Sequence, residues 1–236
     1  MKYKSLLKKD SLGSKSSIYN EKSKVYELFS LSQDNPDKIT KFLNPLIKDK
    51  IVLDLGCGTG KFIPKLAHLS KFYWAIDISS SQLKIAKTKT NKLKNIKIMK
   101  GSAENIPLES NSVDVIFSSW FIGSIHNLRI RRKIIYEANR ILKEKGAIYL
   151  IENDIGGEYK ELVEGKLGNE KTKAKSKWLE EKGFKKIESF KTFFEFKNIR
   201  SAREIFEIIF DKKIASKIYK KRISQNIAIY KNEKKS

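Results

Sequence analysis

The chain has 236 residues, of which 40% are hydrophobic and 11% aromatic, so it is long enough and apolar enough to bury the core of one α/β domain. No run of about eighteen apolar residues occurs, which excludes a membrane-spanning helix, and the basic N-terminus lacks the apolar core of a signal peptide. The single cysteine, Cys57, cannot form an internal disulfide, which suits a reducing, cytoplasmic environment. No metal site is predicted.

The formal net charge of +23 is spread along the chain, and lysine outnumbers arginine 43 to 7. A nucleic-acid surface more often uses arginine, because its guanidinium binds phosphate through two parallel hydrogen bonds. The charge is therefore interpreted first as a solvated surface. A polyanionic partner such as RNA is the alternative, because a field this positive attracts polyanions.

The first 36 residues are predicted to form a leader and cap helices. Residues 1–17 are rich in Lys and Ser, and the apolar spacing over Ser17–Ser30 indicates one helix or two short ones. A turn at Asp34–Asp37 is predicted to begin a helix over Lys38–Ile47. Residues 37–236 are predicted to form a single domain.

A glycine-rich turn follows the first predicted strand. Ile51–Leu55 has the apolar character of a strand covered on both faces, and Gly56, Gly58 and Gly60 follow it. Glycines let the backbone turn sharply and let a ligand approach closely. A helix over Lys61–Ser70 is predicted next, and its N-terminus would suit polar or anionic ligand groups. The glycine spacing is not that of the dinucleotide-binding fingerprint.

The segment Asp54-Leu-Gly-Cys-Gly-Thr-Gly60 resembles the first motif of class I S-adenosylmethionine-dependent methyltransferases, in particular the ubiquinone/menaquinone-biosynthesis-like (type 11) group. The resemblance implies an α/β, Rossmann-like fold with a seven-stranded, mostly parallel sheet and helices on both faces. It implies S-adenosylmethionine as cofactor. The glycines would approach its amino-acid and ribose portions, and Asp54 would orient its ammonium group.

A second buried strand over Phe72–Ser79 carries an aspartate near its end. Asp77 at this place can accept hydrogen bonds from both hydroxyls of a ribose, as the second motif of the family implies, and Ile78 is assigned to the same site. The alternative role for Asp77 is to cap the next helix. That helix, Ser80–Lys94, begins the densest basic run of the chain, which continues to Lys100.

After a third strand over Asn95–Lys100, the segment Gly101–Pro107 resembles the family pattern Gly-Asp-Ala-Glu-Asn-Leu-Pro. Ser102 stands where the family usually has an aspartate that accepts from the adenine amino group, so adenine binding should be weaker. Ser102, Ala103 and Glu104 are expected to surround the adenine.

A fourth strand over Ser112–Ser119 leads to the crevice where cofactor and substrate should meet. Ser119 should line the methionine side of the cofactor through its backbone. His126 is a candidate general base because the ordinary pKa of histidine lies near working pH. The alternative is that His126 is simply a polar residue at the start of a helix. In related methyltransferases N-terminal helices close the substrate pocket, so Tyr19 and Tyr26 either line the pocket or pack their helix on the domain.

The remaining elements are predicted from hydrophobic periodicity and from the residues that begin or end helices and strands. A helix over Leu128–Lys143 is expected to stop at Gly146, before a fifth strand over Ala147–Asp154. Residues 155–225 are expected to supply lid and substrate-side elements. They are a loop over 155–170, a helix over Thr172–Lys182, a long strand over Phe184–Lys197 and a helix opened by a capping box at Ser201–Glu204. Gln225–Tyr230 is predicted as the last strand.

The sequence therefore predicts a methyltransferase that acts on a small-molecule acceptor. The absence of an Asn-Pro-Pro-Tyr or Asp-Pro-Pro-Tyr motif after the fourth strand argues against methylation of a base amino group, and the absence of Pro-Cys argues against pyrimidine C5 chemistry. An RNA methyltransferase is the first alternative, and a protein that binds S-adenosylmethionine without turnover is the second. The glycine spacing disfavours a nicotinamide oxidoreductase.

Overall fold

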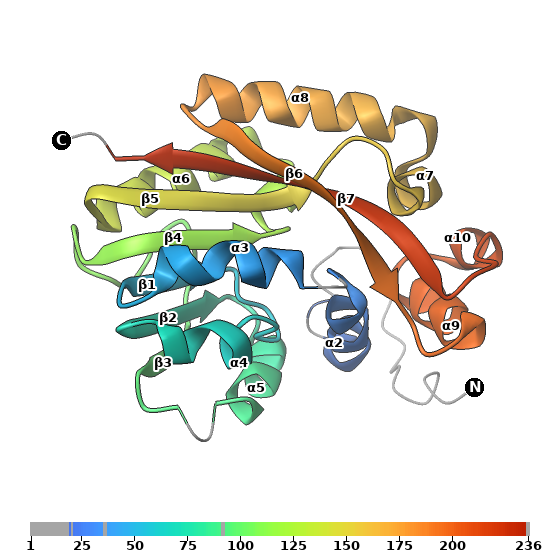
Figure 1. Cartoon of the computed structure of the whole chain (residues 1–236), viewed down its shortest axis with the longest axis horizontal. Coiled ribbons are helices and arrows are strands. Elements are labelled where there is room, and N and C mark those ends of the chain that lie inside the picture. The colour runs from blue at the N-terminus through green and yellow to red at the C-terminus, as the bar shows by residue number, and fades with distance from the viewer. Residues whose placement is uncertain (1–18, 20, 35–36, 91–92, 235–236) are drawn as a thin grey trace.

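The computed structural model describes residues 19, 21–34, 37–90 and 93–234, which build one seven-stranded sheet in the order β3-β2-β1-β4-β5-β7-β6 (Figure 1). The strands are β1 (Ile51–Leu55), β2 (Phe72–Asp77), β3 (Ile96–Lys100), β4 (Val113–Ser119), β5 (Leu142–Asn153), β6 (Lys185–Glu195) and β7 (Arg222–Glu233). Strands β1 to β5 pair in parallel, and β7 pairs antiparallel to both β5 and β6. The predicted Rossmann-like sheet is confirmed.

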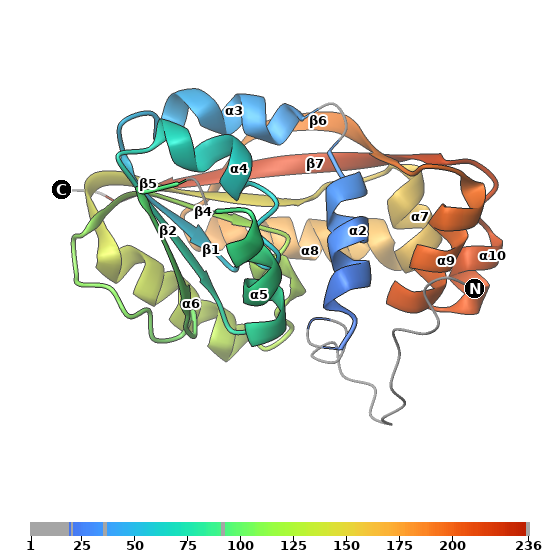
Figure 2. The same ribbon diagram turned by 90° about the horizontal axis from the view of Figure 1, so that it is seen from below.

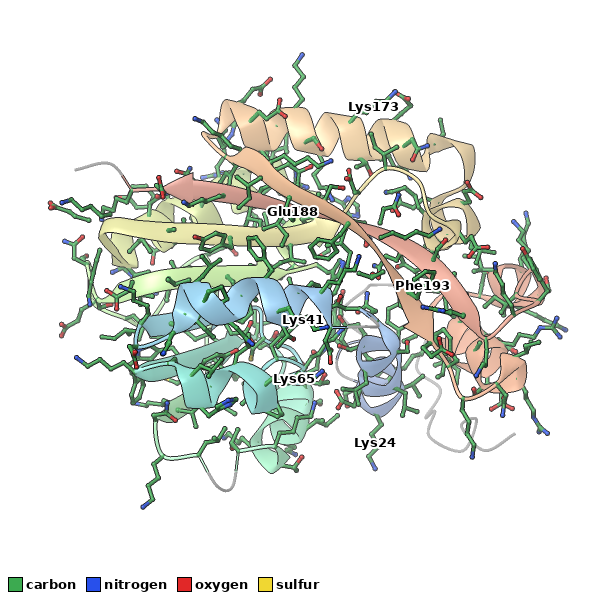
Figure 3. The ribbon with its side chains drawn as sticks, viewed as in Figure 1. Lys24, Lys41, Lys65, Lys173, Glu188 and Phe193 are labelled. Atoms are coloured by element: carbon green, nitrogen blue, oxygen red, sulfur yellow. The ribbon has the colours of Figure 1, made fainter. Side chains whose placement is uncertain are left out.

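Helices cover both faces of this sheet. They are α2 (Ser23–Ser32), α3 (Lys38–Ile47), α4 (Ile63–Leu66), α5 (Ser80–Thr88), α6 (Leu128–Ile141), α7 (Glu158–Glu164), α8 (Gly168–Glu181), α9 (Ile199–Ile209) and α10 (Lys212–Ser216). Figure 2 shows α3 and α4 on one face, with α6 and α8 on the opposite face. The lysines labelled on α2, α3, α4 and α8 in Figure 3 are all exposed, as expected for a solvated basic surface.

The alternation of side chains along the inner strands produces two cores, one under each helical layer. On one face, the helices α3, α4 and α5 bury Leu43, Leu66 and Ala86 against the sheet. On the other face, α6 and α8 bury Ile134 and Leu179. Because β1, β2 and β4 are parallel, their carboxyl ends lie at the same edge of the sheet.

A third, aromatic cluster lies beyond the carboxyl ends of the parallel strands. The ends of β6 and β7 extend past the rest of the sheet and carry α9 and α10, which pack near α2 and α7 (Figure 1). Phe29 of α2 lies in the middle of this cluster, with its ring 5.0 Å from that of Phe194 and 5.8 Å from that of Phe206. We call α2, α7, α9, α10 and the ends of β6 and β7 the cap.

Two predicted helices differ from the structure near the glycine-rich turn and after it. The helix predicted over Lys61–Ser70 is a single turn, α4, followed by a 3-10 turn over Ala67–Leu69, because the tight turn itself continues to Phe62. A helix this short has no N-terminal ligand site. The helix predicted over Ser80–Lys94 ends at Thr88.

The predictions after β4 need further corrections. Helix α6 ends at Ile141 without a glycine stop, because Leu142 already belongs to β5 and Gly146 lies inside that strand. The predicted loop over 155–170 contains α7, a 3-10 turn over Gly165–Leu167 and the start of α8.

The capping box of α9 is formed by Asn198 and Ser201, three residues before the predicted pair. The predicted leader, residues 1–17, lies outside the described residues. Within those that are described, no helix is long and apolar enough to cross a membrane.

Candidate active site

A cavity of about 310 Å³ opens at the carboxyl ends of β1, β2 and β4, where the family resemblance placed the cofactor. It is lined by Tyr19, Tyr26, Leu55, Gly56, Gly58, Ile76, Asp77, Ile78, Ser79, Gln82, Gly101, Ser102, Ala103, Glu104, Ser119, Trp120, Phe121, Ser124, Ile125, Ile130 and Ile134. Eight of the ten predicted cofactor residues are in this set. Asp54 and Gly60 are not.

The glycine-rich turn lies against the cavity because its backbone takes conformations that side chains disfavour. Gly56 and Gly58 have φ angles of +77° and +54°, and a Cβ built on either would lie 2.6 Å from Phe121 Cγ or from Gln82 Oε1. Gly60 has φ +73°, but a Cβ there would meet Ile63 at 2.8 Å. Gly60 therefore serves the packing of the turn rather than the cavity wall.

Asp77 closes the turn from the end of β2. One carboxylate oxygen accepts the Gly58 N–H at 2.9 Å, and the other accepts the Ser79 N–H at 2.8 Å. Burial raises the pKa of Asp77, and these backbone donors oppose the rise. Each oxygen retains a lone pair that can accept a further hydrogen bond from the cavity. The predicted alternative, in which Asp77 caps α5, is wrong, because Ser79 is the N-cap of that helix.

Asp54 lies beneath the turn and is only 1% exposed. The Tyr73 hydroxyl donates to its Oδ2 at 3.1 Å, whereas Oδ1 has no hydrogen-bond partner among the described residues. Burial raises the pKa of Asp54 to about 8, since it outweighs the Tyr73 hydrogen bond, and the charge of Asp77 adds to the rise. An unpartnered buried carboxylate oxygen is a place where a cationic group, or a water that binds one, would be stabilised.

The predicted adenine segment borders the cavity beside β3. The Ser102 hydroxyl accepts the Glu104 N–H at 3.2 Å, so it shapes its own turn as well as lining the cavity. Ile78, 68% exposed, supplies an apolar surface at the same end. His126 is exposed and does not line the cavity, although its neighbour Ile125 does.

The charges around the cavity are opposite to those of the chain as a whole. The chain has 50 Lys and Arg residues, yet none of the described residues that line the cavity is Lys, Arg or His, while Asp77 and Glu104 are acidic. Groups with phosphates, such as nicotinamide dinucleotides, would find no cation among these described residues. A ligand with a positive charge would be favoured.

Trp120 forms the wall where β4 ends and has an unusual backbone for a bulky residue, with φ +51°. Its Nε1–H donates to Asn153 Oδ1 at 3.1 Å, and the same oxygen accepts from Gln225 Nε2 at 2.7 Å. The Lys61 ammonium lies 5.1 Å from the centre of the indole ring, and burial lowers the pKa of Lys61 to about 7. These contacts from β5, β7 and the glycine-rich turn fix the indole against the cavity.

Both tyrosines considered from the sequence line the cavity and also pack. Tyr26 belongs to α2, and its ring meets that of Tyr19 edge-on at 5.1 Å. Tyr26 also packs on the aromatic cluster of the cap. The Ser79 hydroxyl donates to the Tyr19 carbonyl at 3.1 Å, which ties this segment to the end of β2. Tyr19 and, from α2, Tyr26 thus close one side of the cavity, whereas no described residue of α7, α9 or α10 lines it.

Sequence reasoning missed several lining residues. Gln82 of α5 and the pair Ile130 and Ile134 of α6 were not predicted. The spacing of Ile130 and Ile134 by four residues, on the helix that follows the fourth strand, was the available signal. Nothing in the sequence indicated the contact of Trp120 with Asn153, because it depends on how β4 and β5 are placed.

Comparison with known proteins agrees with this geometry. The family model for the methyltransferase domain matches residues 53–150. The chain is 30% identical over 211 residues to an uncharacterized protein of Methanocaldococcus jannaschii, MJ1252, covering 81% of this chain and 80% of that protein. The chain belongs to the class I S-adenosylmethionine-dependent methyltransferases and is an enzyme of that class.

Two further relatives extend the comparison. The chain is 33% identical over 114 residues to the ubiquinone/menaquinone biosynthesis C-methyltransferase UbiE of Campylobacter jejuni, covering 45% of this chain and 46% of that enzyme. It thus spans about half the length of this enzyme. A solved structure of a SAM-dependent methyltransferase from Aquifex aeolicus shares the fold, with a TM-score of 0.58, 21% identity and coverage of 88% and 97% of the two chains.

Proposed function

We propose that this methyltransferase binds S-adenosylmethionine in the cavity at the ends of β1, β2 and β4 and methylates a small organic molecule. The observation that carries the cofactor assignment is the reversed charge of the cavity, whose described lining has two carboxylates and no basic side chain in a chain of net charge +23. S-adenosylmethionine carries a sulfonium and an ammonium group and no phosphate, so its charges suit this lining.

Each part of the cofactor has a residue that fits it. Asp77 offers two carboxylate oxygens to the ribose hydroxyls, and Gly56 and Gly58 leave room for the cofactor beside the turn. The unpartnered Oδ1 of Asp54 would bind the ammonium group through a water, because Asp54 does not reach the cavity surface. Ile78 would pack on the adenine, beside the segment from Ser102 to Glu104.

When bound, the cofactor supplies an electrophilic methyl group on its sulfonium, so no group of the protein has to activate the donor. The protein has to hold the acceptor in line with that methyl and to exclude water. The rigidly held indole of Trp120 and the rings of Tyr19 and Tyr26 are suited to both tasks, because they are large, largely apolar and fixed by hydrogen bonds or packing. His126 is not proposed as a base.

The proposal of a small acceptor rests on the enclosure of the cavity. Tyr19 and Tyr26 close its side, and the lining is mainly aliphatic and aromatic. UbiE, whose name assigns it to quinone biosynthesis, is among the relatives. A small aromatic or apolar nucleophile would suit this lining better than a phosphorylated one.

The test is a methyl-transfer assay with S-adenosylmethionine labelled in the methyl group. Quinol-like phenols, amines and thiols are offered in turn, and formation of S-adenosylhomocysteine is measured. We expect turnover with at least one uncharged or cationic small acceptor, and its loss in Trp120→Ala. Turnover confined to phosphorylated acceptors, or none at all despite cofactor binding, would contradict the proposal.

A further inference from the structure

One side of α6 exposes a basic and aromatic surface that the proposed reaction does not use. Leu128, Arg129, Arg132, Lys133 and Tyr136 follow one another at helical spacing, and all five are exposed. Tyr136 is 70% exposed and Leu128 46%. We call this surface the α6 face.

The α6 face contains no acidic residue. Glu137 is the sole acid in the sequence of α6, and it is buried at the edge of this face, where it accepts two hydrogen bonds from Arg140 at 2.9 and 2.8 Å and also interacts with the charge of Lys133. No carboxylate of α6 pairs with Arg129 or Arg132.

Two of the seven arginines of the chain differ from the other five in the contacts of their side chains. Five bind within the protein through a carbonyl, a carboxylate or an aromatic ring: Arg131, Arg140, Arg200, Arg203 and Arg222. All seven lie in the described residues, and among these the side chains of Arg129 and Arg132 have no hydrogen bond, ion pair or ring contact. Both lie on the α6 face. In a chain that uses lysine for almost all of its positive charge, two unengaged arginines point to a ligand outside the chain that suits the guanidinium fork.

The α6 face also flanks the candidate active site. Ile130 and Ile134 of the same helix line the cavity, so a ligand bound to the exposed side of α6 would lie about one helix diameter from the cavity. Figure 2 shows that α6 forms an outer layer of the molecule, with no described helix beyond it.

A rival basic region lies on the cap, in a groove lined by Lys197, Arg200, Tyr219, Lys220 and Lys221 with two further residues. Three of its four cations already have carboxylate partners: Arg200 pairs with Glu204, Lys220 with Glu158 and Lys221 with Glu195. Its charge is therefore largely used within the protein, and the α6 face is the stronger candidate.

We propose that the α6 face binds the phosphate backbone of single-stranded RNA. Arg129 and Arg132 can each hold a phosphodiester through two parallel hydrogen bonds, and Lys133 adds a point charge. The exposed Tyr136 ring offers a platform on which an unpaired base can stack, which a duplex would not supply. A lipid surface would need only point charges, for which lysine serves equally well. This proposal goes beyond the proposed function and holds whichever acceptor the cavity takes.

The test measures the fluorescence anisotropy of a labelled oligouridylate titrated with the full chain at several salt concentrations. We expect the double variant Arg129→Ala/Arg132→Ala to bind on the order of tenfold more weakly than the wild type. The slope of log affinity against log salt should fall by about 1.4, because each lost phosphate contact removes about 0.7. Tyr136→Ala should also weaken binding, with its salt slope unchanged.

The matched control is Lys212→Ala/Lys213→Ala, which removes the same charge from two exposed positions of α10. It should bind like the wild type. Equal weakening in both double variants would show that net charge alone attracts the RNA and would overturn the proposal, as would failure of the wild type to bind. Tighter binding to phosphatidylserine vesicles than to RNA, lost in the α6 variant, would overturn it in favour of a membrane.

Two further measurements distinguish a failure of this proposal from a failure of the proposed function. Circular dichroism and thermal unfolding confirm that the variants are folded, and S-adenosylmethionine titration should give the same affinity in the α6 variant as in the wild type. Loss of RNA binding with cofactor binding retained therefore bears on the α6 face alone.

Discussion

Replacing the buried Asp54 by Asn should change how the stability of the protein depends on pH. Burial raises the pKa of Asp54 to about 8 in the folded chain, above its ordinary value of 3.8. The folded state therefore holds a proton that the unfolded chain has lost. The stability from this protonated carboxyl is fully present below about pH 4 and is lost as the pH rises towards 8. Asn keeps the shape and an acceptor for the Tyr73 hydroxyl but cannot ionise.

The size of the effect follows from one proton. Between about pH 5 and pH 7 the folded wild type holds roughly one proton more than the unfolded chain at this position, so unfolding becomes easier by about 1.4 kcal/mol per pH unit. Across that interval the free energy of unfolding of Asp54→Asn should rise relative to the wild type by about 3 kcal/mol.

The assay is urea unfolding of the cofactor-free protein at about pH 5, 6 and 7, with the difference between variant and wild type plotted against pH. Asp114→Asn is the control. Burial alone would raise the pKa of Asp114, but the hydrogen bonds from the Ile51 N–H and Lys143 outweigh it and hold this pKa below its usual range. Asp114 therefore stays ionised throughout this interval. Its variant should be offset by a constant amount. A constant offset for Asp54→Asn as well would refute the reasoning.

Two further substitutions test other parts of the site. Gly56→Ala should weaken S-adenosylmethionine binding, measured by calorimetry, because the added Cβ would lie 2.6 Å from Phe121 Cγ. The control is Gly165→Ala, which should leave the affinity unchanged. Gly165 also has a positive φ, +61°, but no atom lies within 4 Å of its added Cβ. Glu137→Gln should cost about 2 kcal/mol in urea unfolding at neutral pH, since it breaks the paired hydrogen bonds with Arg140. The Arg140 hydrogen bond is the main cause that lowers the pKa of Glu137, so this cost should shrink as the pH falls and the wild-type carboxyl is protonated.

The inner strands and the glycine-rich turn could be predicted because local pattern decides them. Ile51–Leu55 and Ile96–Lys100 are continuous apolar or alternating runs bounded by turn residues, and the helix over Lys38–Ile47 was predicted to the residue. Gly56, Gly58 and Asp77 reach the cavity because they follow strands whose carboxyl ends must meet in a parallel sheet.

The cap and its contacts could not be predicted in the same way. The segment 155–170 looks loop-like because it is rich in Gly and Glu, yet α7 forms there through contacts with distant β7, such as the Ser224 hydroxyl accepting from the Glu158 N–H at 3.1 Å. The Trp120–Asn153–Gln225 contact joins a residue directly after β4 to side chains of β5 and β7, so it exists only once the sheet has formed. The burial of Asp54, in contrast, follows from the predicted strand Ile51–Leu55, although its hydrogen bond with Tyr73 depends on the pairing of β1 with β2.

The most direct test of the central claim is a calorimetric titration of S-adenosylmethionine into the wild type, Asp77→Ala and the milder Asp77→Asn at moderate salt. Two hydrogen bonds from the ribose to a charged acceptor are lost in Asp77→Ala, so we predict an affinity on the order of a hundredfold lower. Since Asp77 also binds the Gly58 and Ser79 N–H groups, unfolding curves must show that the variants are folded. A folded wild type that binds no S-adenosylmethionine, or a folded Asp77→Ala that binds it as tightly as the wild type, would contradict the account.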